Sequence, residues 1–318
     1  MNRLKNTLTL LLFFVASRIP SWVATFVISI SAPCYRLLNS QTMRQLRRNL
    51  TIVMGRAPSR DEEITALKSY WQYFASAFTL GRATKVQIEN RVFASIPAQL
   101  LEEIKTKSVV VAMGHQGDWD LAGAFFAAKY APVLTVAENL NPPSLAKKFT
   151  DLRRDIGMEI ILLEKGKSVF STLVDKARKA PRLVPLLADR DLSGGGIVVP
   201  FCGTEALFAP GPAALAKRLD TSLYVVNMQL LELPPERRKI AKTKYGIKLI
   251  VNGPIERPRV TDNDLVVEWT KSWVKTWEAG IKLAPTDWHM TQAVFLPDLD
   301  PVRLAKARKR YQQNVGEN

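Results

Sequence analysis

The sequence is poor in the side chains that build metal sites and covalent cross-links. Its 318 residues include only two cysteines, Cys34 and Cys202, and only two histidines, His115 and His289. The cysteines lie far apart and show neither the spacing of metal ligands nor the pattern of a disulfide framework. We therefore expect no metal site, no thiol nucleophile and a reducing compartment. The sequence also has no G-x-S-x-G motif, which argues against a serine nucleophile of the α/β-hydrolase type.

Acidic residues are absent from the first 60 positions, and the whole chain carries a formal net charge of +16. A chain this basic favours polyanionic partners such as nucleic acid, acidic lipid or phosphorylated small molecules. No helix-turn-helix, zinc-finger or RNA-binding signature is present, so we expect no nucleic acid partner. The anionic surface of a lipid bilayer fits the basic, apolar N-terminus better.

The N-terminal segment also lacks a long apolar run. Its two apolar stretches, Leu8–Ala16 and Trp22–Ala32, are each shorter than the roughly 20 residues that span a bilayer. A spanning helix would have to pass unbroken through Pro20. A signal peptide would fit the basic start, but the basic, apolar character continues past the first stretch. The composition favours short helices in the membrane interface over residues 1–58, with their cations toward anionic headgroups.

Hydrophobic patterns beyond this segment alternate between strand and helix. Short apolar runs predict strands at 109–111, 133–136, 159–163, 183–187, 197–199, 222–230 and 245–251. Periodic or capped segments predict helices at 59–80, 97–104, 120–129, 143–156, 169–178, 212–218 and 264–282. The helix at 59–80 has aromatic residues spaced for a buried stripe, at Tyr70, Trp71, Phe74 and Phe78.

This alternation predicts an α/β domain over residues 59–300, with a mostly parallel central sheet and helices on both faces. Residues 301–318 predict a basic C-terminal helix and tail. That helix could be a solvated basic face or a second contact with a lipid surface.

The segment Gly114–Asp120 follows the apolar strand pattern and precedes the apolar helix pattern. Ligands collect at the carboxyl ends of parallel strands, so His115 is expected to face a cleft. An imidazole can accept a hydroxyl proton near neutral pH, and a nearby carboxylate can fix its tautomer. The spacing predicts His115 as a general base with Asp120 as its partner and Asp118 as the alternative acid. The alternative is a structural loop histidine and an Asp120 that only caps the helix.

A second predicted strand exit carries Asp189, Arg190 and Asp191. These three side chains could neutralise one another at the surface, or an aspartate could face the same cleft as His115. The other histidine, His289, follows a tryptophan in a late loop, and we expect it to be structural.

Several segments occur together in the order and spacing of one enzyme family. They are Arg47–Leu50, Tyr70–Phe74, Gly114–Asp120, Phe149–Met158, Asp189–Asp191, Val198–Gly203, Gly211–Ala216 and Pro285–Met290. Together they resemble the bacterial lipid acyltransferases that acylate lipid A precursors and phosphatidylinositol mannosides. The resemblance covers about residues 40–300. Each segment alone is weak evidence for the family, whereas their order and spacing together are specific to it.

The chain is most similar to the actinobacterial phosphatidylinositol mannoside branch, in Ala188–Ser193 and Gly211–Ala216. The lipid A branch usually has Glu at the position of Asp120 and Gln at that of Arg190. These departures favour a mannoside acceptor, and a lipid A precursor is the alternative acceptor. A non-enzymatic membrane-surface adaptor is the alternative of another class, because it would use the basic N-terminus but would not need His115.

The resemblance implies a glycerolipid-acyltransferase-like fold and an acyl-CoA co-substrate, commonly palmitoyl-CoA, with no cofactor. It implies a mannose hydroxyl of a membrane glycolipid as acceptor and a peripheral enzyme on the cytoplasmic face of the inner (plasma) membrane. His115 and Asp120 would be catalytic. Substrate-binding roles are expected for Arg153, Asp189, Arg190 and Asp191. Arg153 would contact the oxyanion or the donor phosphates, and Asp189 is preferred for contacting sugar hydroxyls.

Overall fold

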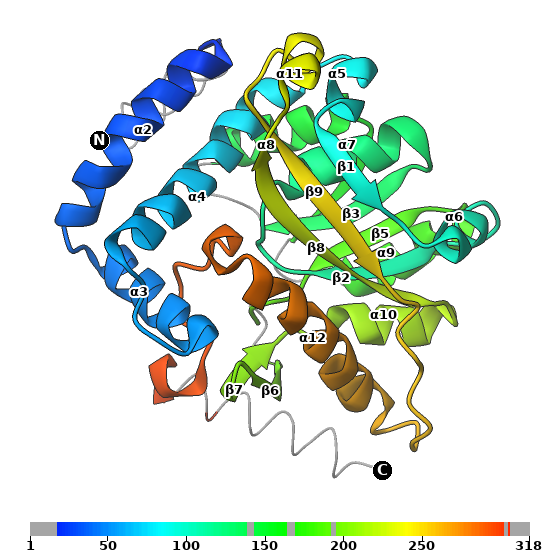
Figure 1. Ribbon diagram of the computed structural model, residues 1–318. Coiled ribbons are helices and arrows are strands. Elements are labelled where there is room, and N and C mark those ends of the chain that lie inside the picture. Colours follow the sequence, from blue (N-terminus) through cyan, green and yellow to red (C-terminus); the bar gives the residue numbers. More distant parts are fainter. Residues whose placement is uncertain (1–17, 139–142, 164–168, 192–194, 302–304, 306–318) are drawn as a thin grey trace.

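The computed structural model describes residues 18–138, 143–163, 169–191, 195–301 and 305. Its main strands are Val92–Ser95 (β1), Val109–Met113 (β2), Val133–Glu138 (β3), Met158–Leu163 (β4), Leu183–Leu187 (β5), Leu223–Glu232 (β8) and Tyr245–Asn252 (β9). They form a seven-stranded sheet in the order β1-β9-β8-β2-β5-β3-β4 (Figure 1). Neighbouring strands run parallel except β8 and β9, which are antiparallel. The predicted mostly parallel α/β fold is confirmed.

Helices cover both faces of this sheet (Figure 1). They are Ala98–Glu103 (α6), Trp119–Lys129 (α7), Pro143–Asp155 (α8), Val169–Lys179 (α9), Gly211–Leu219 (α10) and Leu265–Leu283 (α12), with the short Lys85–Glu89 (α5) and Pro235–Ala241 (α11) near one edge. All of β2 is buried. Val110 and Ala112 face the core formed with α9, α10 and α12, whereas Val109 and Val111 face the core formed with α6 and α7. This two-sided burial explains why β2 is a continuous apolar run.

Three features depart from the predicted strands. The predicted strand at 197–199 is not in the main sheet: Ile197–Phe201 (β6) pairs only with Thr204–Phe208 (β7), in a separate antiparallel hairpin. Cys202 and Gly203 turn this hairpin with positive φ angles of 51° and 80°. β1 was not predicted, because only its first residue is buried. β9 is antiparallel because the short α11 connection returns the chain directly beside β8.

Within the described residues, the helices Ser21–Leu37 (α2), Gln41–Met54 (α3) and Arg60–Leu80 (α4) come before α5 and the sheet. Ser59 and Glu62 form a capping box at the start of α4. α2 lies beside α4 at one side of the molecule (Figure 1). Within the described residues, no single helix is long and apolar enough to span a membrane, whereas α2 and α3 together meet that criterion but bend by 92°. The predicted apolar stretch Leu8–Ala16 and the predicted tail helix beyond Pro301 lie outside the described residues, apart from residue 305.

Candidate active site

The loop that carries His115 connects β2 to α7, and its two glycines are required by close packing. A Cβ on Gly114 would lie 2.2 Å from Cζ2 of Trp277. Gly117 has a left-handed φ of +61°, and a Cβ there would lie 2.8 Å from the Cβ of Met228. The loop therefore passes against α12 and β8 with no room for side chains at these two positions.

His115 is paired with Asp189 and not with Asp120. The Nδ1 atom of His115 lies 2.7 Å from Oδ1 of Asp189, and the backbone N–H of His115 donates to Oδ2 of the same carboxylate at 2.8 Å. The register of the sheet explains this contact, because Met113 of β2 is the partner of Leu187 of β5. His115 lies two residues after Met113, and Asp189 lies two residues after Leu187. The two residues therefore lie side by side at the ends of neighbouring parallel strands.

The carboxylate of Asp189 is fully buried and held in its ionised form. Burial alone would raise its pKa, but the electrostatic interaction with His115 and the hydrogen bonds from His115 and Trp288 outweigh burial and hold the pKa of Asp189 below its usual value. An ionised carboxylate can only accept, so Nδ1 of His115 carries the shared proton. The Nε2 atom is left as the basic nitrogen, on a side chain that is 23% exposed.

Asp120 has a different partner, which makes the predicted contact with His115 wrong. Its Oδ1 accepts from Nε of Arg153 at 2.7 Å, and its Oδ2 accepts from Nη2 of Arg153 at 3.1 Å and from the Tyr73 hydroxyl at 3.0 Å. The reason is local: Asp118 is the N-cap of α7, accepting from Leu121 N–H at 3.0 Å. Asp120 therefore lies within the first turn and faces α4 and α8 instead of the imidazole.

Arg153 was predicted to bind substrate, and the structure shows it in a buried ion pair. Burial is the largest single influence and would lower its pKa, but the Asp120 charge, the Tyr73 side chain and the hydrogen bonds to both together raise the pKa of Arg153 above its ordinary value. The pair ties α8 to the start of α7 beside the His115 loop. Whether Arg153 also contacts a substrate stays a prediction.

Arg190 and Asp191 do not share their charges with Asp189. Arg190 Nη2 lies 2.7 Å from Oε2 of Glu138, at the end of β3, and Nη1 donates to the side chain of Gln292. Asp191 is buried against Gly196, where an added Cβ would lie 2.6 Å from the Cβ of Asp191. The three residues therefore do not form the self-neutralising surface group that was one of the two predicted arrangements.

The segment 287–289 holds the His115 loop in place. His289 N–H donates to the carbonyl of His115 at 2.7 Å, and Gly117 N–H donates to the carbonyl of Asp287 at 2.9 Å. Nε1 of Trp288 donates to Oδ2 of Asp189 at 2.8 Å. Sequence analysis missed Trp288 as a site residue, because a tryptophan in a late loop carries no local sign that its indole N–H reaches a distant carboxylate.

The buried side of α4 carries polar as well as apolar side chains and is not the predicted aromatic stripe. The aromatic residues of that stripe are only half-buried. The buried positions Ser69, Tyr73 and Ser76 donate respectively to Asp287, Asp120 and Asp118. These positions are spaced by four and three residues, so one helix face holds three carboxylates around the site.

A buried polar group lies behind the loop. The Ser69 hydroxyl donates to Oδ1 of Asp287 at 2.6 Å, and Nε2 of His289 lies 2.9 Å from the Ser69 oxygen. Because the hydroxyl proton points to Asp287, Nε2 of His289 must carry a proton and donate. Burial lowers the pKa of His289 to about 3 and raises that of Asp287 to about 6. The predicted structural role of His289 agrees with a ring that stays neutral.

The stability of the protein should depend on His289 as the pH falls. Below about pH 6.5 the His289 imidazole binds a proton in the unfolded chain but not in the folded chain. The free energy of unfolding therefore falls by up to about 1.4 kcal/mol for each unit by which the pH is lowered. Asp287 acts in the opposite direction between about pH 6 and 4, because the folded chain binds its proton first. Comparison with His289→Gln isolates the imidazole, since Gln can keep the donor to Ser69.

The measurement is urea unfolding of both proteins at about pH 7 and about pH 5. The wild type should lose more stability between the two pH values than His289→Gln, by roughly 2 kcal/mol. Equal losses in the two proteins would contradict the assigned burial of a neutral His289.

Within the described residues, no group of three or more His, Cys, Asp and Glu side chains is placed to hold a metal ion. The site instead combines a partly exposed imidazole, a buried carboxylate on its far nitrogen and aromatic walls. The Trp119 ring lies edge-on to His115 with ring centroids 5.3 Å apart. Such a site can remove a proton from a hydroxyl group without forming a covalent enzyme intermediate.

Comparison with known proteins identifies the class to which this fold and site belong. Residues 4–296 match the bacterial lipid A biosynthesis acyltransferase family, and the chain belongs to that family. The protein is therefore an acyltransferase.

Two mycobacterial relatives are similar over most of the chain. A phosphatidylinositol mannoside acyltransferase of Mycolicibacterium smegmatis is 30% identical over 268 residues, covering 82% of each chain. A protein of the same name from Mycobacterium tuberculosis is 29% identical over 273 residues, covering 84% of this chain and 81% of the relative. The predicted resemblance to the mannoside branch is confirmed by these similarities.

Proposed function

We propose that this acyltransferase moves a fatty acyl chain, typically palmitoyl, from acyl-CoA to a mannose hydroxyl of a phosphatidylinositol mannoside. The observation that carries the proposal is the similarity to two relatives with that name across more than four fifths of the chain. The pairing of His115 with Asp189 supplies the chemistry that the transfer requires.

The reaction needs one proton to move twice. Nε2 of His115 takes the proton of the acceptor hydroxyl while the oxygen attacks the thioester carbonyl. Asp189 holds the Nδ1 proton and stabilises the imidazolium, as a buried carboxylate does in serine hydrolases. Collapse of the tetrahedral intermediate forms the ester and breaks the C–S bond, and the imidazolium returns the proton to the departing CoA thiolate. The acyl group passes directly from sulfur to oxygen.

The other predicted residues have proposed supporting roles. Asp120 becomes a positioning residue, since its ion pair with Arg153 fixes α7 beside the loop. The cations Arg153 and Arg190 are proposed to attract the donor phosphates or the oxyanion. Asp191 keeps its proposed role toward sugar hydroxyls. Asp189 no longer has that role, because its oxygens are occupied by His115 and Trp288.

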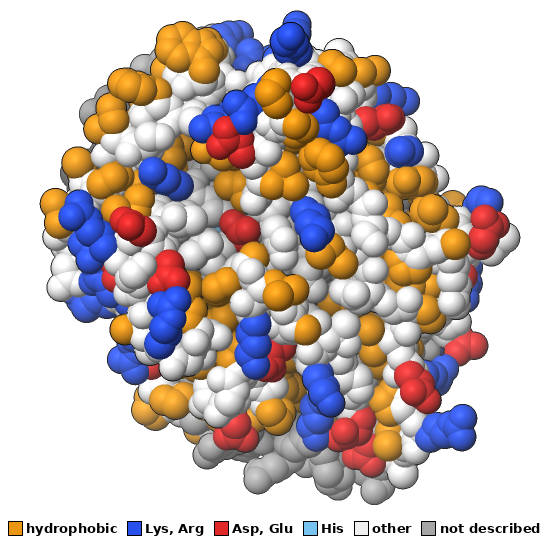
Figure 2. Space-filling model, in the orientation of Figure 1, with side chains coloured by type: hydrophobic (Ala, Val, Ile, Leu, Met, Phe, Trp, Pro, Cys, Tyr) orange, Lys and Arg blue, Asp and Glu red, His pale blue; other side chains and the backbone are white. Residues whose placement is uncertain are grey.

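The proposed location is the membrane surface, with the enzyme peripheral on the cytoplasmic face of the plasma membrane, where acyl-CoA is made available. α2 supports this, because Trp22 and Phe26 are 73% and 62% exposed and Val27 and Ile30 are exposed beside them. Figure 2 shows hydrophobic side chains gathered along α2, at the upper left of the view. An apolar face of this kind can lie in the headgroup region of a bilayer.

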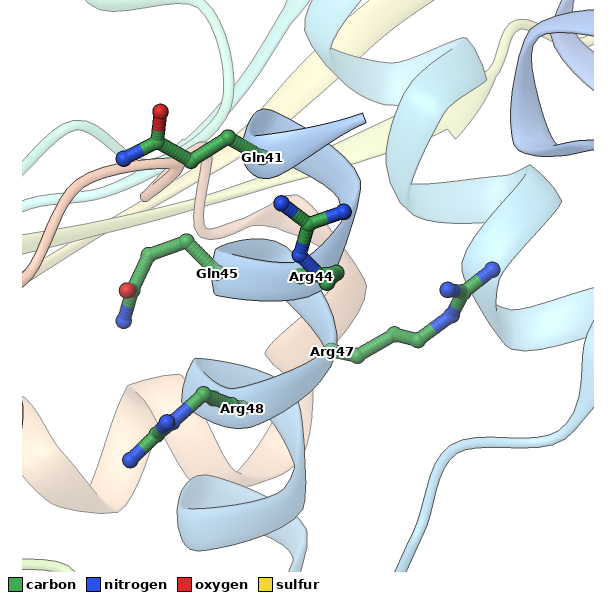
Figure 3. A pocket seen from close by; sticks show the side chains of 5 residues that line it. All are labelled: Gln41, Arg44, Gln45, Arg47 and Arg48. Atoms are coloured by element: carbon green, nitrogen blue, oxygen red, sulfur yellow. The ribbon is translucent and has the colours of Figure 1, made fainter. Parts of the chain in front are cut away.

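α3 adds cations next to this apolar face. A hollow of 540 Å³ on α3 is lined by Gln41, Arg44, Gln45, Arg47 and Arg48 (Figure 3). Arg47 reaches toward α4, where it pairs with Glu63. Arg48 pairs with Asp298, whereas Arg44 has no acidic partner within the described residues. The surface of α3 therefore contributes a modest attraction for anionic lipid.

Loss of the apolar face should weaken vesicle binding. The double variant Trp22→Ser/Phe26→Ser is expected to partition at least about tenfold less into anionic vesicles, since each buried aromatic side chain contributes roughly 1.5–3 kcal/mol. Vesicle co-sedimentation measures this. Phe170→Ser, at an exposed position of α9, is the control and should partition like the wild type. Unchanged binding of the double variant would exclude α2 as the membrane contact.

A direct assay tests the function. Purified protein receives palmitoyl-CoA with either a phosphatidylinositol mannoside or a lipid A precursor, and mass spectrometry detects the product. The mannoside should be acylated, whereas acylation of only the lipid A precursor would establish the alternative that the family description favours. A protein that binds both lipids but releases no CoA would be the membrane-surface adaptor.

A further inference from the structure

A basic cavity lies where the start of α2 meets α4, α5 and α11. Its volume is 340 Å³. Figure 1 shows these elements together at the top of the view. Ser21 at the start of α2 donates to the carbonyl of Lys242 at the end of α11, at 2.9 Å, which closes one side of the cavity. The cavity is distinct from the hollow on α3.

The charge of the cavity wall has one sign. Four cationic side chains line it: Arg18, Arg82, Arg91 and Lys242. Gln72, Ser76 and Thr79 of α4 add polar side chains, and none of the described lining residues is acidic. Arg18, Arg82 and Lys242 are exposed, so they form the rim. A wall with several cations and hydroxyl groups matches an anion with several acceptor oxygens, and a phosphate group has that chemistry.

Arg91 forms the buried floor, and its side chain is only 7% exposed. Its Nε donates to the carbonyl of Tyr245 at 3.3 Å, and its Nη2 donates to the Ser76 hydroxyl at 2.7 Å. The nearest carboxylate is Asp118, at 3.5 Å from Nη2, and Nη1 has no partner within the described residues. Burial lowers the pKa of Arg91, while Asp118 opposes this effect only in part. A buried guanidinium with a single counter-ion is stabilised by a further anion.

The position of the cavity indicates where the phosphate comes from. Its wall includes residues 18–21, directly before Trp22, whose side chain is 73% exposed. The cavity therefore lies beside the apolar face of α2, at the place where an inserted face would bring phospholipid headgroups.

We propose that this cavity binds the headgroup phosphate of an anionic membrane phospholipid, with Arg91 at the floor and Arg18, Arg82 and Lys242 at the rim. The proposal rests on the membrane association proposed above. It has a consequence for the active site, because Arg91 and Ser76 also hold Asp118, the N-cap of the helix that follows the His115 loop. A phosphate at the floor would add a charge next to the contacts that fix this loop.

The test uses a pair of charge-matched double variants of the full chain. Arg82→Gln/Lys242→Gln removes two exposed rim cations, whereas Lys85→Gln/Lys239→Gln removes two exposed cations of α5 and α11 that are outside the cavity wall. Arg91 itself stays, since its buried side chain is part of the folded core. Binding is measured with water-soluble dihexanoyl-phosphatidylinositol and with phosphatidylinositol-containing vesicles. Inorganic phosphate serves as the probe that carries the phosphate without the lipid.

The wild type and the control variant should bind dihexanoyl-phosphatidylinositol with saturation, and the rim variant should bind it at least about tenfold more weakly, given two lost charge-assisted contacts. The vesicle affinities should rank in the same order. If both double variants lost the same amount of lipid affinity, the cavity proposal would be overturned, because the lipid would then be held by general attraction to the basic surface. Inorganic phosphate that binds as tightly as the lipid would overturn the lipid assignment.

Acyl transfer to detergent-dispersed acceptor separates this proposal from the proposed function. If the wild type transfers the acyl chain but all variants bind the lipid probe equally, the cavity proposal alone fails. If the probe binds as expected and no acyl chain is transferred, the proposed function alone fails.

Discussion

Replacement of His115 by alanine should lower acyl transfer by at least about 10³-fold, because the acceptor hydroxyl loses the base proposed to take its proton. Asp189 is a poor substitute, because it is buried beneath the imidazole and its Oδ2 accepts hydrogen bonds from a backbone and an indole N–H. CoA release and mass detection of the acylated glycolipid measure the effect.

The second histidine provides the control for this experiment. His289→Gln changes a buried ring that stays neutral and whose Nε2 contacts Ser69. This variant should retain more than about a tenth of the activity, since its backbone contact with the loop is unchanged. A His115→Ala enzyme that is folded by circular dichroism and nearly as active as the wild type would refute the general-base mechanism.

Asp189→Asn should lower kcat by roughly 10²–10⁴-fold with little change in the binding of acyl-CoA. The carboxylate accepts three hydrogen bonds, two from His115 and one from Trp288. An amide has one acceptor oxygen and would place an N–H₂ group against at least one of these donors. If the amide nitrogen faces Nδ1, the imidazole is driven into the tautomer that carries its proton on Nε2, and such an imidazole cannot accept the hydroxyl proton.

Asp120→Asn distinguishes the two carboxylates. This change removes the carboxylate charge that pairs with the mostly buried Arg153, so the free energy of unfolding should fall by about 3 kcal/mol. Its effect on kcat should be smaller than that of Asp189→Asn, because Asp120 does not touch the imidazole. If Asp120→Asn instead matches the kcat loss of Asp189→Asn at unchanged stability, Asp120 would have to act on His115 directly.

The sequence predicts both strands that carry His115 and Asp189 but does not predict that these strands are neighbours. The apolar runs at 109–111 and 183–187 identify β2 and β5, and the residues that follow each strand were recognised as candidates. β5 lies next to β2, with Met113 opposite Leu187. This strand order is a property of the whole sheet and cannot be inferred from the sequence of either strand alone. Sequence proximity therefore favoured Asp120, although Asp189 is the neighbour in space.

The polar face of α4 was missed for a related reason. Hydrophobic periodicity assumes that the inward side of a helix is apolar. In α4, Ser69, Tyr73 and Ser76 are buried because carboxylates from the loops satisfy their hydroxyl groups. A sequence reveals such positions only when the partners are also known, and those partners come from distant parts of the chain.

The hydrogen bonds between the His115 loop and residues 287–289 set the order in which activity can appear during folding. β2, β5 and β8 can pair, and α7 can dock, before this last segment arrives. Until residues 287–289 are in place, Asp189 and the His115 loop lack three hydrogen bonds, one each with Asp287, Trp288 and His289. Contacts between residues this far apart in sequence close slowly, because the chain entropy of a long loop must be overcome. A refolding chain should therefore regain its helical circular dichroism before it regains turnover.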